Sequence, residues 1–168
     1  MTAEERRGQI LSRLKASAAP VSAHALAEAY GVSRQIIVGD IALLRAAGEE
    51  ITATPRGYAT PRDAGFLRRT VACVHDGAGT ERELNIMVDN GCTVLDVIVE
   101  HPVYGQLTGA LELRSRYDVR QFLARSEGAA PLSSLTDGIH LHTLLCPDED
   151  AFLRVKNELS NAGFLLPE

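Results

Sequence analysis

The sequence has no long apolar run, and cysteine is scarce. None of its apolar segments approaches the roughly 18 residues that a membrane-spanning helix needs. The first ten residues, MTAEERRGQI, lack the apolar core of a signal peptide. We therefore expect a cytoplasmic protein with no membrane partner. The three cysteines, Cys73, Cys92 and Cys146, stand singly in apolar runs without CxxC spacing, which predicts buried thiols and no disulfide framework.

A strongly basic balance is also missing, since the net charge of the chain is -5. Residues 1–60 carry seven Lys or Arg and six Asp or Glu, whereas residues 61–168 carry ten and sixteen. The first part, at +1, can therefore still approach DNA through locally placed arginines. Gly-rich phosphate loops and nucleophile motifs are absent as well, so we do not expect an enzyme.

The first 60 residues have the pattern of a winged helix-turn-helix. Apolar residues recur at helical spacing over residues 4–16, 22–30 and 33–47, with Ser22 and Ser33 as N-caps and Gly31 as the turn. A short hairpin over residues 50–60 then forms the wing. The expected core face of the third helix consists of Ile36, Ile37, Ile41 and Leu44.

The start of the third helix is the expected DNA-reading surface, because the second helix of such a motif lies in the major groove. Gly39 costs this helix about 1 kcal/mol relative to Ala but would permit a close approach to DNA. The alternative is a winged domain that binds protein. We expect the following residues to contact DNA: Ser33, Arg34, Gln35, Val38, Arg45, Arg56 and Tyr58.

Residues 61–65 read as a linker, which divides the chain into a domain over 1–60 and a second over 61–168. The second part alternates β-branched runs with helical stretches in the order β-α-β-β-α-β-α. This order predicts a ferredoxin-like split βαβ domain with one added helix. The fold class is therefore α+β.

The late strand over residues 139–146 contains a His-x-His pair. Alternate residues of a strand share a face, so His140 and His142 lie about 7 Å apart on one side. Two surface histidines are the alternative. With His75 and Glu83 from the first strand and helix of the same domain, the pair predicts a metal site that suits zinc, nickel or iron(II).

Three segments resemble the NiaR-type niacin-responsive repressors, which join a winged helix-turn-helix to a 3H domain. The segments are VSRQIIV with DIALLR in the third helix (32–38 and 40–45), DVIVEHPVYG (96–105) and HLHT (140–143). The resemblance implies repression of genes for NAD synthesis or niacin uptake, with nicotinic acid as co-repressor. It also implies metal ligation by His75, Glu83, His140 and His142.

Nicotinate has a pyridine nitrogen that can take an open position on a metal. We expect His101, Tyr104 or Arg114 to orient its carboxylate, and a homodimer whose recognition helices match successive major grooves of operator DNA. A regulator that senses the metal itself is the main alternative. A metallohydrolase is a third, with Asp76 as the one nearby candidate base.

Overall fold

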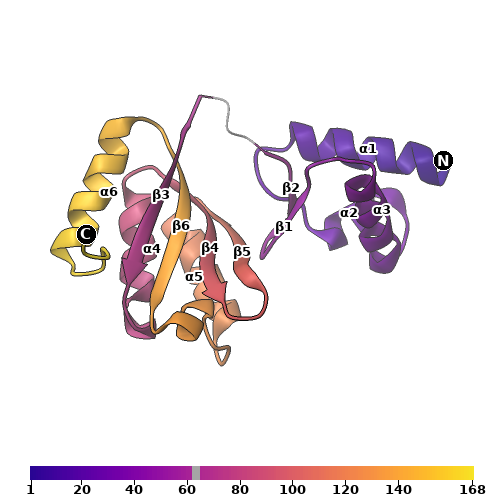
Figure 1. Ribbon diagram of the computed structural model, residues 1–168. Coiled ribbons are helices and arrows are strands. Elements are labelled where there is room, and N and C mark those ends of the chain that lie inside the picture. Colours follow the sequence, from indigo (N-terminus) through magenta and orange to yellow (C-terminus); the bar gives the residue numbers. More distant parts are fainter. Residues whose placement is uncertain (62–64) are drawn as a thin grey trace. The chain divides into compact units, whose positions relative to one another are not determined.

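The computed structural model describes residues 1–61 and 65–168, and the chain forms two compact units, Met1–Arg62 and Asp63–Glu168 (Figure 1). The predicted linker over residues 61–65 lies largely outside the described residues. Among the described helices, none is long and apolar enough to cross a membrane.

The first unit is a winged helix-turn-helix, as predicted. Ser22 and Ser33 cap the second and third helices, each accepting a backbone N–H three residues on. Gly31 makes the turn between them with a φ of 63°. The elements are α1 (Ala3–Ala16), α2 (Ala23–Tyr30), α3 (Arg34–Ala46) and the wing strands β1 (Thr52–Thr54) and β2 (Gly57–Ala59).

The buried face of α3 includes a polar residue, Asp40, that we did not expect there. Asp40 is buried, because its carboxylate pairs with Arg6 Nε of α1 at 2.6 Å. The buried set of α3 is Ile37, Asp40, Ile41 and Leu44. Ile36, which we expected in the core, is 43% exposed; the apolar pattern alone could not assign a core position to an aspartate.

The second unit has the predicted β-α-β-β-α-β-α order and confirms the α+β class. Its regular elements begin with β3 (Leu67–Val74), η1 (Gly77–Gly79), α4 (Thr80–Asp89), β4 (Thr93–His101) and β5 (Gly105–Leu113). They continue with α5 (Arg116–Ser126), η2 (Leu132–Thr136), β6 (Ile139–Cys146) and α6 (Glu149–Asn161).

The four long strands form an antiparallel sheet in the order β3-β6-β4-β5 (Figure 1). The parallel strands β3 and β4 are thus split by β6, the last strand. In a ferredoxin-like sheet the third strand occupies that place, so the likeness lies in the element order and not in the strand order. As a result, the strand with the two histidines is flanked on both sides.

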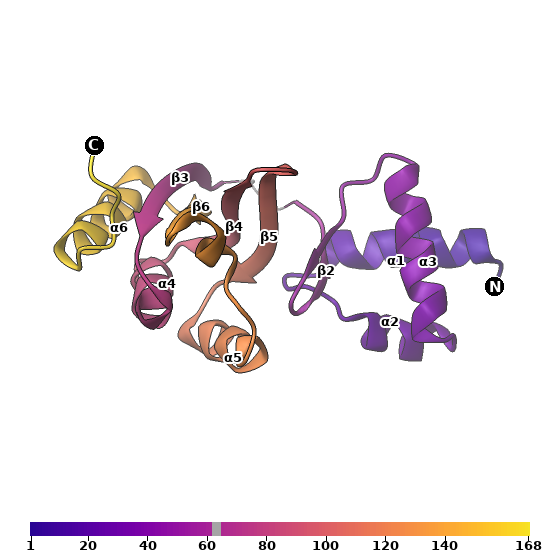
Figure 2. The same ribbon diagram turned by 60° about the horizontal axis from the view of Figure 1, so that its bottom comes forward.

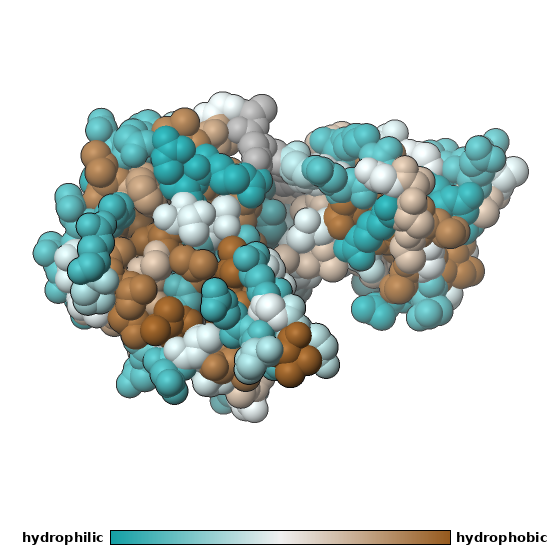
Figure 3. Space-filling view, viewed as in Figure 1, coloured by the Kyte–Doolittle hydropathy of each residue, from teal (hydrophilic) through white to brown (hydrophobic). Residues whose placement is uncertain are grey.

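One face of this sheet carries helices α4 and α5, with α6 beside them toward β3 (Figure 2). The core between sheet and helices includes Leu84, Met87 and Leu144. Over the opposite face, apolar side chains gather on β3, β6 and β4 (Figure 3). Leu141 and its cross-strand partner Ile98 are half-buried there. His140 and His142 alternate with Leu141 and therefore point toward the helices.

Candidate metal centre and DNA-binding helix

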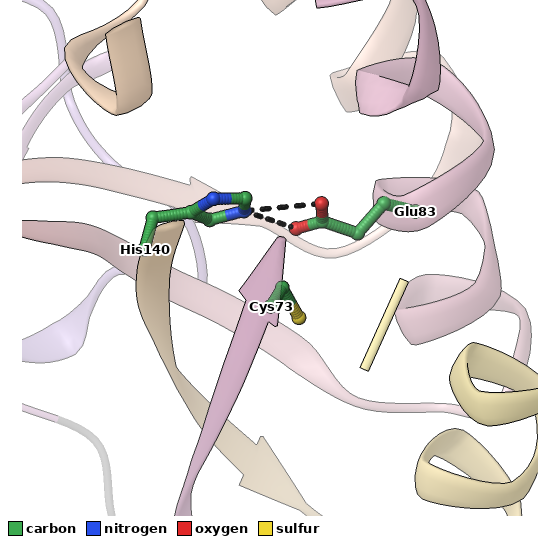
Figure 4. A group of neighbouring side chains, drawn as sticks. All are labelled: Cys73, Glu83 and His140. Carbon is green, nitrogen blue, oxygen red and sulfur yellow. Dashed lines mark hydrogen bonds and ion pairs between the residues drawn. The ribbon is translucent and has the colours of Figure 1, made fainter. Parts of the chain in front are cut away.

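The four predicted metal ligands meet in the interior of the second unit. His75 follows β3, Glu83 lies in the first turn of α4, and His140 and His142 lie on β6. Their side chains are 7%, 1%, 3% and 4% exposed. His140 Nε2 is 3.0 and 3.1 Å from the two oxygens of Glu83 (Figure 4). The Nε2 atoms of His75 and His142 also contact this carboxylate, so the alternative of surface histidines is wrong.

A backbone carbonyl orients each histidine by accepting a hydrogen bond from Nδ1, on the side of the ring that faces away from Glu83. A carbonyl oxygen can only accept, so each Nδ1 carries a proton, and each Nε2 is the ring nitrogen that faces Glu83 and can give its electron pair to a cation once its own proton has left. The acceptors are the carbonyl oxygens of Asp76 for His75, of Gly138 for His140 at 2.8 Å, and of Asp96 for His142 at 2.6 Å.

The charges at this site compensate one another. Burial acts to raise the pKa of Glu83, but hydrogen bonds from His140 and His142 outweigh it and lower the pKa to about 2. Burial acts in the opposite sense on His140, and there too the contact with Glu83 prevails and raises the pKa. Glu83 is therefore ionised, and a proton held between it and His140 must leave when a cation binds.

The donor set fits a divalent transition metal. Three neutral imidazole nitrogens and one carboxylate are ligands that zinc, nickel and iron(II) accept, whereas calcium and magnesium prefer oxygen alone. His75 Nε2 is buried, and its close contact with the Glu83 carboxylate is not a regular hydrogen bond. A cation bound between these two groups would be a ligand partner for both of them.

Cys73 also lies at this site, although the sequence predicted only a buried thiol there. Its Sγ, the Glu83 carboxylate and a ring nitrogen of His140 lie within 4.8 Å of one another (Figure 4). Cys73 is the cross-strand partner of His140, which places both side chains on one face. Burial, followed by the negative charge of Glu83, raises the pKa of the thiol, so without a cation at the site the thiol stays protonated.

Two glycines that sequence reasoning missed fix the position of His75. A Cβ at Gly138, where φ is 89°, would lie 2.4 Å from the carbonyl oxygen of His75. A Cβ at Gly79 would lie 3.0 Å from the His75 ring and from Phe164. Only glycine allows both segments to approach the ligand so closely.

A cavity of about 290 Å³ opens beside His75. Its walls combine backbone, two serine hydroxyls and two carboxylates, one of which, that of Asp76, accepts the N–H of Ala78. The lining residues are His75, Asp76, Gly77, Pro131, Ser133, Ser134, Asp137 and Gly138.

The three residues predicted to orient a ligand carboxylate do not line this cavity. His101 ends β4, and its Nδ1 accepts the N–H of Val103 and of Tyr104. Tyr104 is 74% exposed at the following turn. Arg114 follows Leu113, which ends β5 at the far end of the strand from that turn. Their role in binding stays a prediction.

The residues predicted to contact bases lie at the N-terminal end of α3. Arg34 and Gln35 are exposed in its first turn, and the Ser33 hydroxyl is the cap that accepts the N–H of Ile36 at 3.3 Å. Val38 is half-buried. The first turn is therefore available to a partner, whereas Val38 has little free surface.

The wing residues are tied to the fold. Arg45 Nε donates to the carbonyl oxygen of Ile51 at 2.7 Å, and its guanidinium lies 6.0 Å from the Tyr58 ring centroid. The backbone of Tyr58 exchanges two 2.9 Å hydrogen bonds with Val21. Arg56 lies between the two wing strands and is half-buried. Arg45 and Tyr58 thus hold the wing against α3, whatever they contact on DNA.

A winged helix-turn-helix joined to a separate α+β domain is the architecture of a transcriptional regulator. Comparison with known families agrees: the HTH domain matches residues 6–59, and the 3H domain matches residues 68–168.

The chain is 44% identical to the transcription repressor NadR of Bacillus subtilis (strain 168), over 97% of this chain and 94% of that protein. It is also 44% identical to the probable transcription repressor NiaR of Thermotoga maritima, over 98% and 95%. The chain therefore belongs to the NadR/NiaR family of transcription repressors. Its class is that of a DNA-binding regulator rather than an enzyme.

Proposed function

We propose that this protein represses genes of NAD biosynthesis or niacin uptake, with nicotinic acid as co-repressor and one divalent transition metal in each chain. The names of the two relatives and the niacin-responsive sequence segments support the choice of genes and effector. The observation that carries the proposal is the meeting of three imidazole nitrogens and one carboxylate in a buried centre.

The metal centre and the cavity beside it supply complementary parts of an effector site. A bound nickel, zinc or iron(II) ion would offer an open coordination position to the pyridine nitrogen of nicotinate. His75 both belongs to the centre and lines the cavity, which at about 290 Å³ is near the lower end of the usual range for ligand pockets. The hydroxyl of Ser133 can donate to a carboxylate there, whereas that of Ser134 donates to the carbonyl oxygen of Pro131 at 2.7 Å. His101 and Tyr104 remain proposed contacts.

The protein acts as a homodimer in this proposal. One winged helix-turn-helix presents one recognition helix, which reads one half-site. Two copies related by a twofold axis read two half-sites about 34–36 Å apart. Nicotinate would favour the dimer geometry that matches this spacing.

Gel retardation tests the proposal on the DNA upstream of the protein's own gene. Metal-loaded and chelator-treated protein are compared with and without nicotinate, with nicotinamide as the matched ligand that lacks the carboxylate. We expect retardation only with metal and nicotinate together. Equal retardation by metal-loaded and chelated protein would reject the metal's part in effector binding.

A regulator that senses the metal is the second candidate, favoured by the burial of all four proposed ligands and by the backbone carbonyl that accepts a hydrogen bond from each of the three histidines. In that case, retardation would follow zinc or nickel and would be the same with nicotinate, with nicotinamide and with neither.

A further inference from the structure

The outward face of α3 carries two large apolar side chains. Ile36 is 43% exposed and Leu43 is 55% exposed. They are seven residues apart, which is about two helical turns, and so lie on the same side of α3, beside the face that carries the buried residues Ile37 and Ile41. Single exposed apolar residues are common on protein surfaces, but an aligned pair on a recognition helix calls for a partner.

Gly39 lies between these two residues and is exposed in the middle of α3. A Cβ added there would meet nothing within 4 Å, and its backbone is that of an ordinary helix. Neither packing nor conformation within the described residues requires glycine, which costs about 1 kcal/mol relative to Ala in a helix interior. A close approach of the helix backbone to a partner explains the missing side chain.

The chemistry of this face selects the partner. The exposed residues in the first turn, Arg34 and Gln35, are base- and phosphate-binding types. The apolar Ile36 follows them directly. In the major groove, the C5-methyl group of thymine is the apolar feature that distinguishes one base pair from the others. Residues near the N-terminus of a recognition helix reach the base edges, so Ile36 is placed to contact a base and Leu43 is not.

We propose that Ile36 reads thymine in each half-site by packing on its C5-methyl group, and that Gly39 permits the approach of α3 that this contact needs. The inference rests on the binding of operator DNA, and it adds a specificity-determining residue to that function. The base that Ile36 contacts does not depend on the identity of the metal, the effector or the regulated genes.

The test uses full-length protein and a duplex that this protein selects from a random-sequence pool, both with and without a divalent metal and nicotinate, so it does not presuppose any promoter. Each thymine of the selected site is replaced in turn by deoxyuridine, which removes the methyl group and leaves the base pairing unchanged. At one thymine or more in each half-site, we expect the affinity of the unaltered protein to fall about fourfold, the factor that burying one methyl group supplies.

The Ile36→Ala variant should bind the thymine duplex more weakly and should no longer distinguish it from the uracil duplex. Leu43→Ala is the matched control, because it truncates the other exposed apolar residue of α3 and should keep the discrimination. Thermal melting establishes that both variants fold, as expected for exposed positions.

Discrimination that survives Ile36→Ala, or is lost with Leu43→Ala instead, would overturn the assignment. So would a selected site in which no uracil substitution matters, or a pool from which no sequence is enriched. A promoter that fails to bind in response to nicotinate would count against the proposed function alone.

Discussion

The substitution Gly138→Ala tests how the protein holds His75 and His140 in one centre. The new Cβ would lie 2.4 Å from the carbonyl oxygen of His75, so the two segments must separate by about 1 Å to reach ordinary carbon–oxygen contact. The carbonyl oxygen of Gly138 also accepts the Nδ1–H of His140 at 2.8 Å. The shift therefore displaces two of the four ligands at once.

The expected loss has two parts. A side chain in the left-handed region costs about 1–2 kcal/mol of folding free energy, with or without metal. Misplaced ligand supports reduce metal affinity by about 10- to 100-fold. Competition with a chromophoric chelator measures the metal affinity, and melting of the metal-free protein measures the strain.

Gly128→Ala is the matched control, because Gly128 has a φ of 81° and a Cβ there would meet nothing within 4 Å. This variant should carry the strain and retain the metal affinity. If both variants lose the same stability and neither loses metal affinity, then contact between Gly138 and His75 does not position the ligands, and the reasoning is refuted.

Two further substitutions have matched controls in the same chain. Glu83→Gln removes the one carboxylate among the proposed ligands. It should lower metal affinity more than about tenfold, since losing even the hydrogen-bond partner of a ligand has that effect. The control Glu81→Gln changes an exposed residue of α4 and should leave the metal content, measured by elemental analysis, unchanged. Gly39→Ala should raise the free energy of unfolding of the first unit by about 1 kcal/mol and yet weaken DNA binding in a retardation assay. Gly8→Ala, in the equally open α1, should stabilise without that loss. Metal retained by Glu83→Gln, or full DNA affinity in Gly39→Ala, would contradict the respective assignment.

Local sequence patterns were sufficient to predict the helices and strands of the fold. Serine caps and the Gly31 turn marked the helices of the first unit, and their side-chain and backbone hydrogen bonds are present in the structure. Which face of α3 is buried was harder to predict from the sequence. Burial of Asp40 depends on Arg6, which lies 34 residues away in the chain, and no local pattern reports a partner at that separation.

The proposed metal ligands and the residues that position them also differ in how far the sequence predicts them. His140 and His142 share a face because strand residues alternate, and that follows from the sequence. The proximity of Cys73 to His140 depends on the β3–β6 register. The role of Gly138 depends on a loop that returns to His75. Both contacts depend on how distant segments pair. The periodicity of a single sequence does not predict that pairing.

The strand order decides how the last histidine is held. Because β6 lies beside β4, the carbonyl oxygen of Asp96 accepts the Nδ1–H of His142 and its carboxylate accepts the N–H of Thr143. Asp96 can do both because the β4–β6 register shifts between Val94 and Ile98, which frees this stretch from regular pairing with β6. In a ferredoxin-like order, β5 would separate β3 from β4 and β6 would lie away from Asp96. His142 would then lose the acceptor that directs its Nε2 toward Glu83, so the proposed metal centre depends on the order of strands and not on its four proposed ligands alone.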